Sequence, residues 1–383
     1  MSGPSPRPSP KGEGGPFDIA ALAPANVRAI APYIPGKPIA ETARELGIPE
    51  ADILKMASNE SPVGASPRAI AAIRKALDVL HYYPDGSGYE LKVALARKLS
   101  VAPENLVLGN GSNDVIELVA RAFLRAGESA VFSRHGFMVY PLVVQAIGAR
   151  QIEVPARDFA SDVEAMAAAV RADTKIVFIA NPNNPTGTFT PWDSIRALAE
   201  RVGNGVLVVV DEAYEEYLPD ELRSPTPGWL PRLPNLVVTR TLSKAYGLAG
   251  LRVGYAIAHP AVADVMNRVR QPFNVNHLAM VAAVAALGDD EFIAKSRAVN
   301  AAGLEQLSAG VAKLGLEFIP SHGNFITVRV GDAARIYGSL LASGVIVRPI
   351  AGYGMPEHLR VTVGLPDQNA RFLAELARAL EKR

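Results

Sequence analysis

The sequence predicts an α/β protein with a large domain, built on a mostly parallel doubly wound sheet, and a smaller α+β domain. Three observations lead to this prediction. Short apolar runs alternate with helical patterns from about residue 65 to residue 258, polar clusters follow four of those runs, and the pattern changes after residues 271–274. Alternating strands and helices over such a length are typical of a parallel sheet covered on both faces.

The apolar runs have the length and composition of strands buried on both faces. They occupy residues 106–108, 130–132, 175–179, 206–210 and 236–238. Between the first two, apolar residues recur every three or four positions over residues 115–123. This spacing predicts a helix, and we expect Gly127 to stop it.

The last third of the chain predicts a different arrangement. An alanine-rich helical stretch precedes expected strands near residues 325–330 and 360–363, and an amphipathic helix starts near Asp367. We expect a disordered leader at residues 1–16, which are rich in Pro, Gly and Ser and could bury little apolar surface. Residues 17–64 would form an N-terminal arm and part of the small domain, residues 65–275 the large domain, and residues 276–383 the small C-terminal domain.

Composition excludes several classes of function. The formal net charge of +1 offers no general attraction for nucleic acid or an anionic membrane. The chain has no cysteine, which rules out disulfides, thiolate metal sites and cysteine nucleophiles. No stretch of about 20 apolar residues is present to span a bilayer. We expect a cytoplasmic protein that acts on small molecules, without a metal, nucleic-acid or membrane partner.

Four polar clusters follow the apolar runs, at residues 109–114, 181–187, 211–214 and 241–244. Ligands of open parallel sheets bind beyond the carboxyl ends of the strands. Each cluster alone could be a turn or a helix cap, and Lys244 alone could be a solvated surface lysine. Four clusters at strand ends together predict one pocket.

Two of these clusters suit charged ligand groups, an anion at residues 109–114 and a cation beside Asp211. Small residues at 109–114 would let the start of a helix approach an anion. Two prolines and a glycine at 181–187 would make a rigid loop that presents Asn184. Asp211 directly follows five aliphatic residues, so its charge would need a cationic partner.

Taken together, the clusters resemble the aspartate-aminotransferase-type (fold type I) enzymes that use pyridoxal 5'-phosphate. More narrowly, they are similar to the histidinol-phosphate aminotransferases. The resemblance runs from about residue 33 to the C-terminus, with departures at Ser61 and at His135-Gly136. It rests on Asn184-Pro185-Thr186-Gly187, on Asp211-Glu212-Ala213-Tyr214, on Ser243-Lys244 followed by Arg252, and on residues 82–89, 239–252, 345–349 and 359–364.

The resemblance implies roles for the central residues. Lys244 would carry the cofactor as a Schiff base, and its pKa would have to fall well below the ordinary value of about 10.4 so that it could move a proton. Asp211 would pair with the ring nitrogen. Tyr214 and Asn184 would hydrogen-bond the ring hydroxyl oxygen, and Phe137 would stack on the ring.

The resemblance also implies an anion site for the cofactor and another for the substrate. The cofactor phosphate would contact Ser112, Asn113, Thr241, Ser243 and Arg252, together with Tyr83 from the other subunit of a homodimer. The substrate would contact Tyr33, Asn59, Asn184, Arg348 and Arg360.

The activity implied is transamination of histidinol phosphate with 2-oxoglutarate, which gives imidazole acetol phosphate and glutamate in histidine biosynthesis. Two alternatives share the same motifs, an aromatic amino-acid aminotransferase and a threonine-phosphate decarboxylase. A more remote one is a non-catalytic binding protein that keeps the fold.

Overall fold

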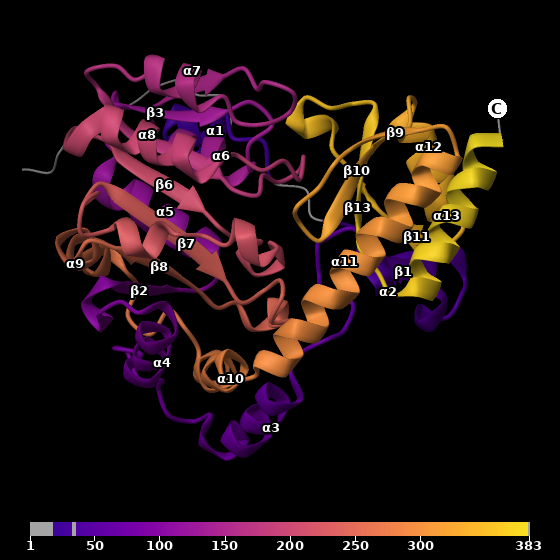
Figure 1. Cartoon of the computed structure of the whole chain (residues 1–383), viewed down its shortest axis with the longest axis horizontal. Helices are drawn as coiled ribbons and strands as arrows, with labels where there is room; N and C mark the ends of the chain where they lie inside the picture. Colours follow the sequence, from indigo (N-terminus) through magenta and orange to yellow (C-terminus); the bar gives the residue numbers. More distant parts are fainter. Residues whose placement is uncertain (1–17, 33–35, 382–383) are drawn as a thin grey trace, which may run out of the picture.

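The computed structural model describes residues 18–32 and 36–381, which form a larger α/β part and a smaller α+β part side by side (Figure 1). The predicted leader at residues 1–16 and the predicted site residue Tyr33 lie outside these ranges. The helices are α1 (Ala25–Arg28), α2 (Ile39–Leu46), α3 (Pro67–Ala76), α4 (Tyr89–Leu99), α5 (Ser112–Phe123), α6 (Val139–Ile147), α7 (Val163–Ala168), α8 (Trp192–Val202), α9 (Pro260–Val269), α10 (His277–Leu287), α11 (Asp290–Lys313), α12 (Ala333–Ala342) and α13 (Pro366–Glu381). The strands are β1 (Leu54–Lys55), β2 (Leu106–Gly109), β3 (Ser129–Ser133), β4 (Arg150–Val154), β5 (Thr174–Ala180), β6 (Leu207–Asp211), β7 (Leu236–Thr241), β8 (Gly254–Ala258), β9 (Glu317–Ile319), β10 (Phe325–Arg329), β11 (Val345–Ile346), β12 (Arg348–Pro349) and β13 (His358–Thr362).

The larger part is built on a seven-stranded sheet in the order β2-β8-β7-β6-β5-β3-β4. The strands from β7 to β4 run parallel to one another. β8 runs antiparallel to its two neighbours, β2 and β7. The predicted α/β fold with a mostly parallel sheet is confirmed.

Both faces of this sheet are covered by helices, and β5 shows how the sequence encodes this. Ile176 and Phe178 belong to the core beneath α5, α6 and α9. Val177 and Ile179 point to the opposite face and pack with residues of α4, α7, α8 and α10. Because successive strand residues alternate between faces, a strand buried on both sides reads as a continuous apolar run.

In the larger part, the structure differs from the sequence-based expectation in two strands of the sheet and at one helix end. β4 and β8 are strands that no apolar run had indicated. β4 lies at the sheet edge with mostly exposed or half-exposed residues, so its sequence is polar. The helix over residues 115–123 does not continue to Gly127, because α5 ends at Phe123 and Leu124 is already extended.

The smaller part contains an antiparallel sheet in the order β12-β13-β10-β9, packed against α11, α12 and α13. β1 pairs in parallel with β11, which brings residues 54–55 of the N-terminal segment to this part. We propose that the domains divide after residues 64 and 275. α10, which follows the second boundary, packs on α3 and α4 beside the larger sheet. None of the helices in the described ranges is both long and apolar enough to cross a membrane.

Candidate active site

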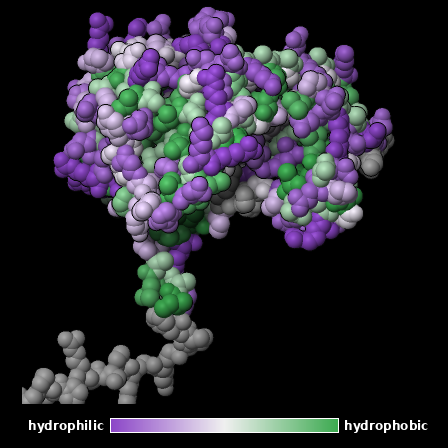
Figure 2. Space-filling model, turned by 90° about the horizontal axis from the view of Figure 1, so that it is seen from below, coloured by the Kyte–Doolittle hydropathy of each residue, from purple (hydrophilic) through white to green (hydrophobic). Residues whose placement is uncertain are grey.

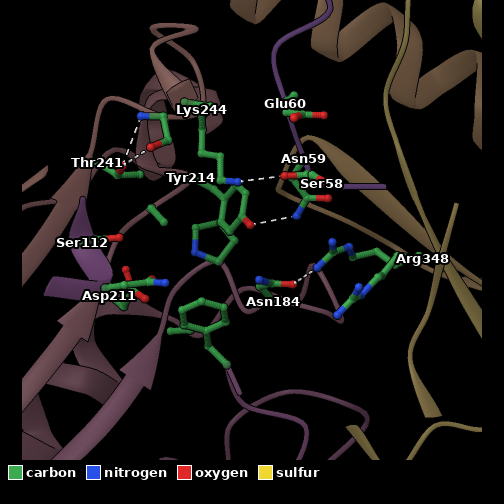
Figure 3. A pocket seen from close by; sticks show the side chains of 18 of the residues that line it. Ser58, Asn59, Glu60, Ser112, Asn184, Asp211, Tyr214, Thr241, Lys244 and Arg348 are labelled. Atoms are coloured by element: carbon green, nitrogen blue, oxygen red, sulfur yellow. Dashed lines mark hydrogen bonds between the residues drawn. The ribbon is translucent and has the colours of Figure 1, made fainter. Parts of the chain in front are cut away.

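The carboxyl ends of β5, β6 and β7 border a pocket of about 260 Å³, which the small-domain strands β12 and β13 also line (Figure 3). The structure thus brings together side chains that lie far apart in the sequence. The predicted site residues that line the pocket are Asn59, Ser112, Asn113, Phe137, Asn184, Asp211, Tyr214, Thr241, Ser243, Lys244, Arg252, Arg348 and Arg360.

Lys244 extends from the loop after β7 into this pocket. Its Nζ donates a hydrogen bond to the carbonyl oxygen of Ser58 at 3.1 Å and lies 5.9 Å from the ring centroid of Tyr214. Burial, reinforced by the nearby positive charge of Arg360, lowers the pKa of Lys244 to about 7. A substantial fraction of this amine is therefore neutral near pH 7, as a group that accepts a proton must be.

Asp211 is the last residue of β6 and is almost completely buried. Its Oδ2 accepts a hydrogen bond from the phenol of Tyr140, and its Oδ1 accepts one from Thr239, each at 3.1 Å. Burial raises the pKa of Asp211 to about 6 despite these bonds. A positively charged group bound beside Asp211 would therefore be stabilised.

Tyr214 links the pocket to the N-terminal segment. Its hydroxyl accepts a hydrogen bond from Nδ2 of Asn59 at 2.8 Å, and Asn59 in turn contacts Thr362 of β13. Burial raises the pKa of Tyr214 to about 12, so the hydroxyl keeps its proton and can donate it to an oxygen in the pocket.

An anion cradle lies at the start of α5. Thr241 donates a hydrogen bond to Ser243 at 2.9 Å, and Arg252 Nη1 donates one to the same Ser243 hydroxyl at 3.3 Å. A Cβ added at Gly111 would lie 2.3 Å from Nη2 of Arg252, so only glycine admits the guanidinium so close to Ser112, the first residue of the helix. Free N–H groups, hydroxyls and a guanidinium together suit a phosphate.

A second positive region comes from two arginines of the small domain. Arg348 of β12 and Arg360 of β13 are directly opposite each other in the antiparallel pair, and both line the pocket. Arg360 donates to Asn184 Oδ1 at 2.5 Å and to the carbonyl oxygen of Ala57 at 2.8 Å, but its buried Nε has no partner. Two like charges directly opposite destabilise a sheet unless an anion lies between them.

Tyr83 is a predicted site residue that does not line the pocket. Its side chain is 82% exposed and stacks on Phe273, with 4.8 Å between the ring centroids. Within one chain it therefore does not contribute to the site.

Several residues near the site had not been identified from the sequence. Tyr140 and Thr239 bind Asp211, while Glu60 and Tyr353 line the pocket. The His135 ring, at one departure from the family pattern, reaches the Tyr353 carbonyl oxygen at 2.5 Å. Only Thr239 carried a usable signal in the sequence, since it lies two residues before Thr241 in the same predicted strand.

Comparison with known proteins agrees with this geometry. The model of the family "aminotransferase class I and II" matches residues 51–376. The chain therefore belongs to the class I and II aminotransferases. This membership accounts for the buried amine, the buried carboxylate and the phosphate cradle at the ends of the parallel strands.

Within that family, the chain is similar to proteins named histidinol-phosphate aminotransferase. It is 60% identical to the one from Thiobacillus denitrificans, over 94% of either chain. The identity to one from Nitrosospira multiformis is 57%, over 95% of this chain and 93% of that one.

Solved structures show the same likeness. A histidinol-phosphate aminotransferase from Sinorhizobium meliloti in complex with pyridoxal 5'-phosphate superimposes with a TM-score of 0.84, at 29% identity and covering 93% of this chain and 96% of that one. An aspartate aminotransferase from Thermus thermophilus gives a TM-score of 0.80 at 26% identity, over 93% and 99% of the two chains.

The pocket fits the pyridoxal phosphate of the Sinorhizobium meliloti structure. The cradle of Arg252 and Ser243, kept open by the glycine at position 111, suits its phosphate. Asp211 is a buried carboxylate that would suit a protonated ring nitrogen, and Lys244 is a partly neutral amine that would suit its aldehyde.

Proposed function

We propose that this protein is a pyridoxal-phosphate-dependent aminotransferase that transfers the amino group of histidinol phosphate to 2-oxoglutarate. The products are imidazole acetol phosphate and glutamate, a step of histidine biosynthesis. The observation that carries the proposal is the environment of Lys244, a buried amine with a pKa of about 7 in one pocket with Asp211 and three arginines.

When bound, pyridoxal phosphate supplies a conjugated ring that accepts the electrons left on a substrate carbon that loses its proton. Arg252, Ser243 and Thr241, together with Ser112 and Asn113 at the start of α5, would hold its phosphate. Phe137 also lines the pocket and offers an aromatic face to the ring.

The chain's own groups would then handle the proton. The Lys244 amine would take the proton from the substrate carbon and return it, since burial keeps the amine partly neutral near pH 7. Asp211 would keep the ring nitrogen protonated. Tyr214 and Asn184, which follow β6 and β5 of the large sheet, would donate hydrogen bonds to the ring hydroxyl oxygen through a hydroxyl and an amide.

The two substrates differ at their anionic ends, and the arginine pair suits both. Histidinol phosphate carries a phosphate, whereas glutamate and 2-oxoglutarate carry a second carboxylate. A guanidinium offers paired, coplanar donors to either oxyanion. Arg348 and Arg360 would bind these ends alternately, with Asn59 and Asn184 beside them.

A half-reaction panel tests the proposal. Purified holoenzyme would be mixed with histidinol phosphate, glutamate, phenylalanine, tyrosine or threonine phosphate while the cofactor absorption is recorded. We expect rapid conversion by histidinol phosphate and glutamate. Conversion by glutamate and phenylalanine without histidinol phosphate would assign an aromatic aminotransferase, and carbon dioxide release from threonine phosphate would assign a decarboxylase.

The role of Lys244 is tested by borohydride reduction of the cofactor-loaded protein. The wild-type chain should retain the cofactor covalently after reduction and denaturation, and so should Lys75→Ala, which alters an exposed lysine of α3. Lys244→Ala should release it. A covalent linkage that persists in Lys244→Ala would disprove the central assignment.

We further propose a homodimer in which Tyr83 reaches the cofactor phosphate of the neighbouring subunit. Tyr82, Tyr83 and Tyr89 are 68%, 82% and 64% exposed, although large aromatic rings normally gain by burial. Near residue 18 the chain projects from the body as a hydrophobic segment (Figure 2), where Ile19 and Leu22 are 69% and 71% exposed. A second copy of the chain could cover both surfaces.

The cytoplasm is the compartment we propose for this activity. Histidinol phosphate carries a charged phosphate, and the cost of moving such a charge into hydrocarbon keeps it where it is made. The enzyme would therefore act in the compartment that produces its substrate.

A further inference from the structure

The carboxylate of Asp211 has two hydroxyl donors, one on each oxygen. Thr239 lies on the neighbouring strand β7 and pairs with Asp211 in the sheet register. The other donor, Tyr140, belongs to α6, which packs on one face of the sheet. Among the residues that the structure describes, no other side chain of α6 bonds to Asp211. Tyr140 does not line the pocket itself.

Tyr140 is held in one orientation. Its side chain is 1% exposed, and its ring stacks on Phe178 of β5 at 4.9 Å with an interplanar angle of 8°. Phe137, which does line the pocket, meets the same ring edge-on at 5.8 Å. Two aromatic contacts leave the phenol little freedom other than to point at Asp211.

The phenol of Tyr140 can act only as a donor to this carboxylate. Burial and the neighbouring charge of Asp211 raise the pKa of Tyr140 well above its ordinary value, so the hydroxyl keeps its proton. A hydrogen bond from a neutral donor stabilises the charged form of an acid over its neutral form.

We infer that Tyr140 is a positioning residue: its phenol holds the Asp211 carboxylate charged and oriented, and thereby keeps the ring nitrogen of bound pyridoxal phosphate protonated. The inference rests on the role proposed above for Asp211 and extends it to a side chain outside the pocket. Without this donor, Asp211 becomes more basic and draws the shared proton away from the ring.

The test is the chemical shift of the ring nitrogen in holoenzyme reconstituted with ¹⁵N-labelled pyridoxal phosphate. In wild-type protein the signal should be that of a protonated ring at pH 7.5. Tyr140→Phe keeps the aromatic contacts but removes the hydroxyl, which should raise the pKa of Asp211 by about one to two units. The signal should move toward the unprotonated position, and kcat should fall about tenfold with KM little changed.

Tyr255→Phe is the matched control. It removes the similarly buried phenol of β8. The charged neighbours of Tyr255 are Arg240, Glu215 and Glu216, and not Asp211. This variant should leave the ring-nitrogen signal in place. A signal in Tyr140→Phe that equals the wild-type signal would overturn the inference.

Two further measurements separate the possible failures. Asp211→Asn should itself displace the ring-nitrogen signal, and if it does not, the proposed role of Asp211 fails. If Asp211→Asn displaces the signal and Tyr140→Phe does not, the role of Asp211 stands and the inferred role of Tyr140 is wrong. Placing 3-fluorotyrosine at position 140 strengthens the donor without changing the packing. It should hold the ring protonated to a higher pH, a gain that a folding defect could not produce.

Discussion

Burial acts in opposite directions on the two ionisable side chains at the centre of the pocket. It lowers the pKa of Lys244 from 10.5 to about 7 and raises that of Asp211 from 3.8 to about 6. In both cases the charged form loses its hydration. Each group is therefore costly to keep charged in the cofactor-free protein, and a ligand that offers a cation to Asp211 and takes up the Lys244 amine relieves both costs.

The shift of Lys244 makes the stability of the cofactor-free protein depend on pH. Between about pH 7 and pH 10.5, Lys244 is protonated in the unfolded chain but neutral in the folded protein. The free energy of unfolding therefore rises with pH across this window. We expect Lys244→Met to be more stable than wild type by about 4 kcal/mol at pH 6.5, with the difference nearly gone at pH 10.5. Urea unfolding of the apoproteins measures this.

The control for this experiment is Lys75→Met, which changes an exposed lysine on α3. It should follow the wild-type curve at every pH. A constant offset between Lys244→Met and wild type from pH 6.5 to pH 10.5 would contradict the titration and point to packing instead.

At the scale of elements, the site depends on how closely α5 approaches the loop after β7. Gly254 of β8 leaves room for the N–H of Ser112, since an added Cβ would lie 2.5 Å from that nitrogen. Gly111 leaves room for Arg252 in the same way, and its φ of 86° is one that other residues rarely adopt. The two glycines let the start of the helix and the guanidinium converge on one anion.

Gly111→Ala should therefore weaken cofactor binding, by about 10- to 100-fold. The added methyl group would displace the Arg252 guanidinium. Gly127→Ala is a close control, because Gly127 has a φ of 84° but no atom within 4 Å of an added Cβ. Titration of each apoprotein with pyridoxal phosphate gives the affinities. Equal affinities in the two variants would contradict the predicted effect of the clash.

At the scale of the whole molecule, the pocket is assembled from segments that meet only because the larger and smaller parts are side by side (Figure 1). The large sheet provides Asp211 and Lys244, whereas β12 and β13 provide Arg348 and Arg360. Hydrogen bonds from Arg360 to Asn184 and from Lys244 to residue 58 cross this junction. The position of the small domain thus decides whether Arg348 and Arg360 face Lys244.

Subunit mixing tests the proposed dimer. Lys244→Ala and Tyr83→Phe should each be impaired alone, the second through weaker cofactor binding. If Tyr83 serves the neighbouring subunit, a mixed dimer has one site with both defects and one with neither. Random exchange should then restore activity to about a quarter of the sites. No recovery on mixing would show that Tyr83 acts in its own subunit or not at all.

The sequence alone determined the fold class and most of the pocket. A strand whose alternating side chains are buried on both faces of a sheet reads as a continuous apolar run. The residue after each run then lies at the carboxyl edge of the parallel sheet. Asp211 closes the run of β6, and Lys244 lies three residues beyond the end of β7, so their convergence follows from local pattern. β4 escaped this reasoning because an edge strand needs no apolar run.

Only the tertiary structure decided which side chains tune those groups. Tyr140 lies 71 residues before Asp211, on α6. The other residues of this helix are mostly apolar, so the sequence gives no sign that Tyr140 contacts a carboxylate. Likewise, Arg348 meets Arg360 through the register of an antiparallel pair. Local periodicity specifies an element and the direction its residues face, but packing and register set which partner each residue meets, and the pKa values of Asp211 and Lys244 depend on those partners.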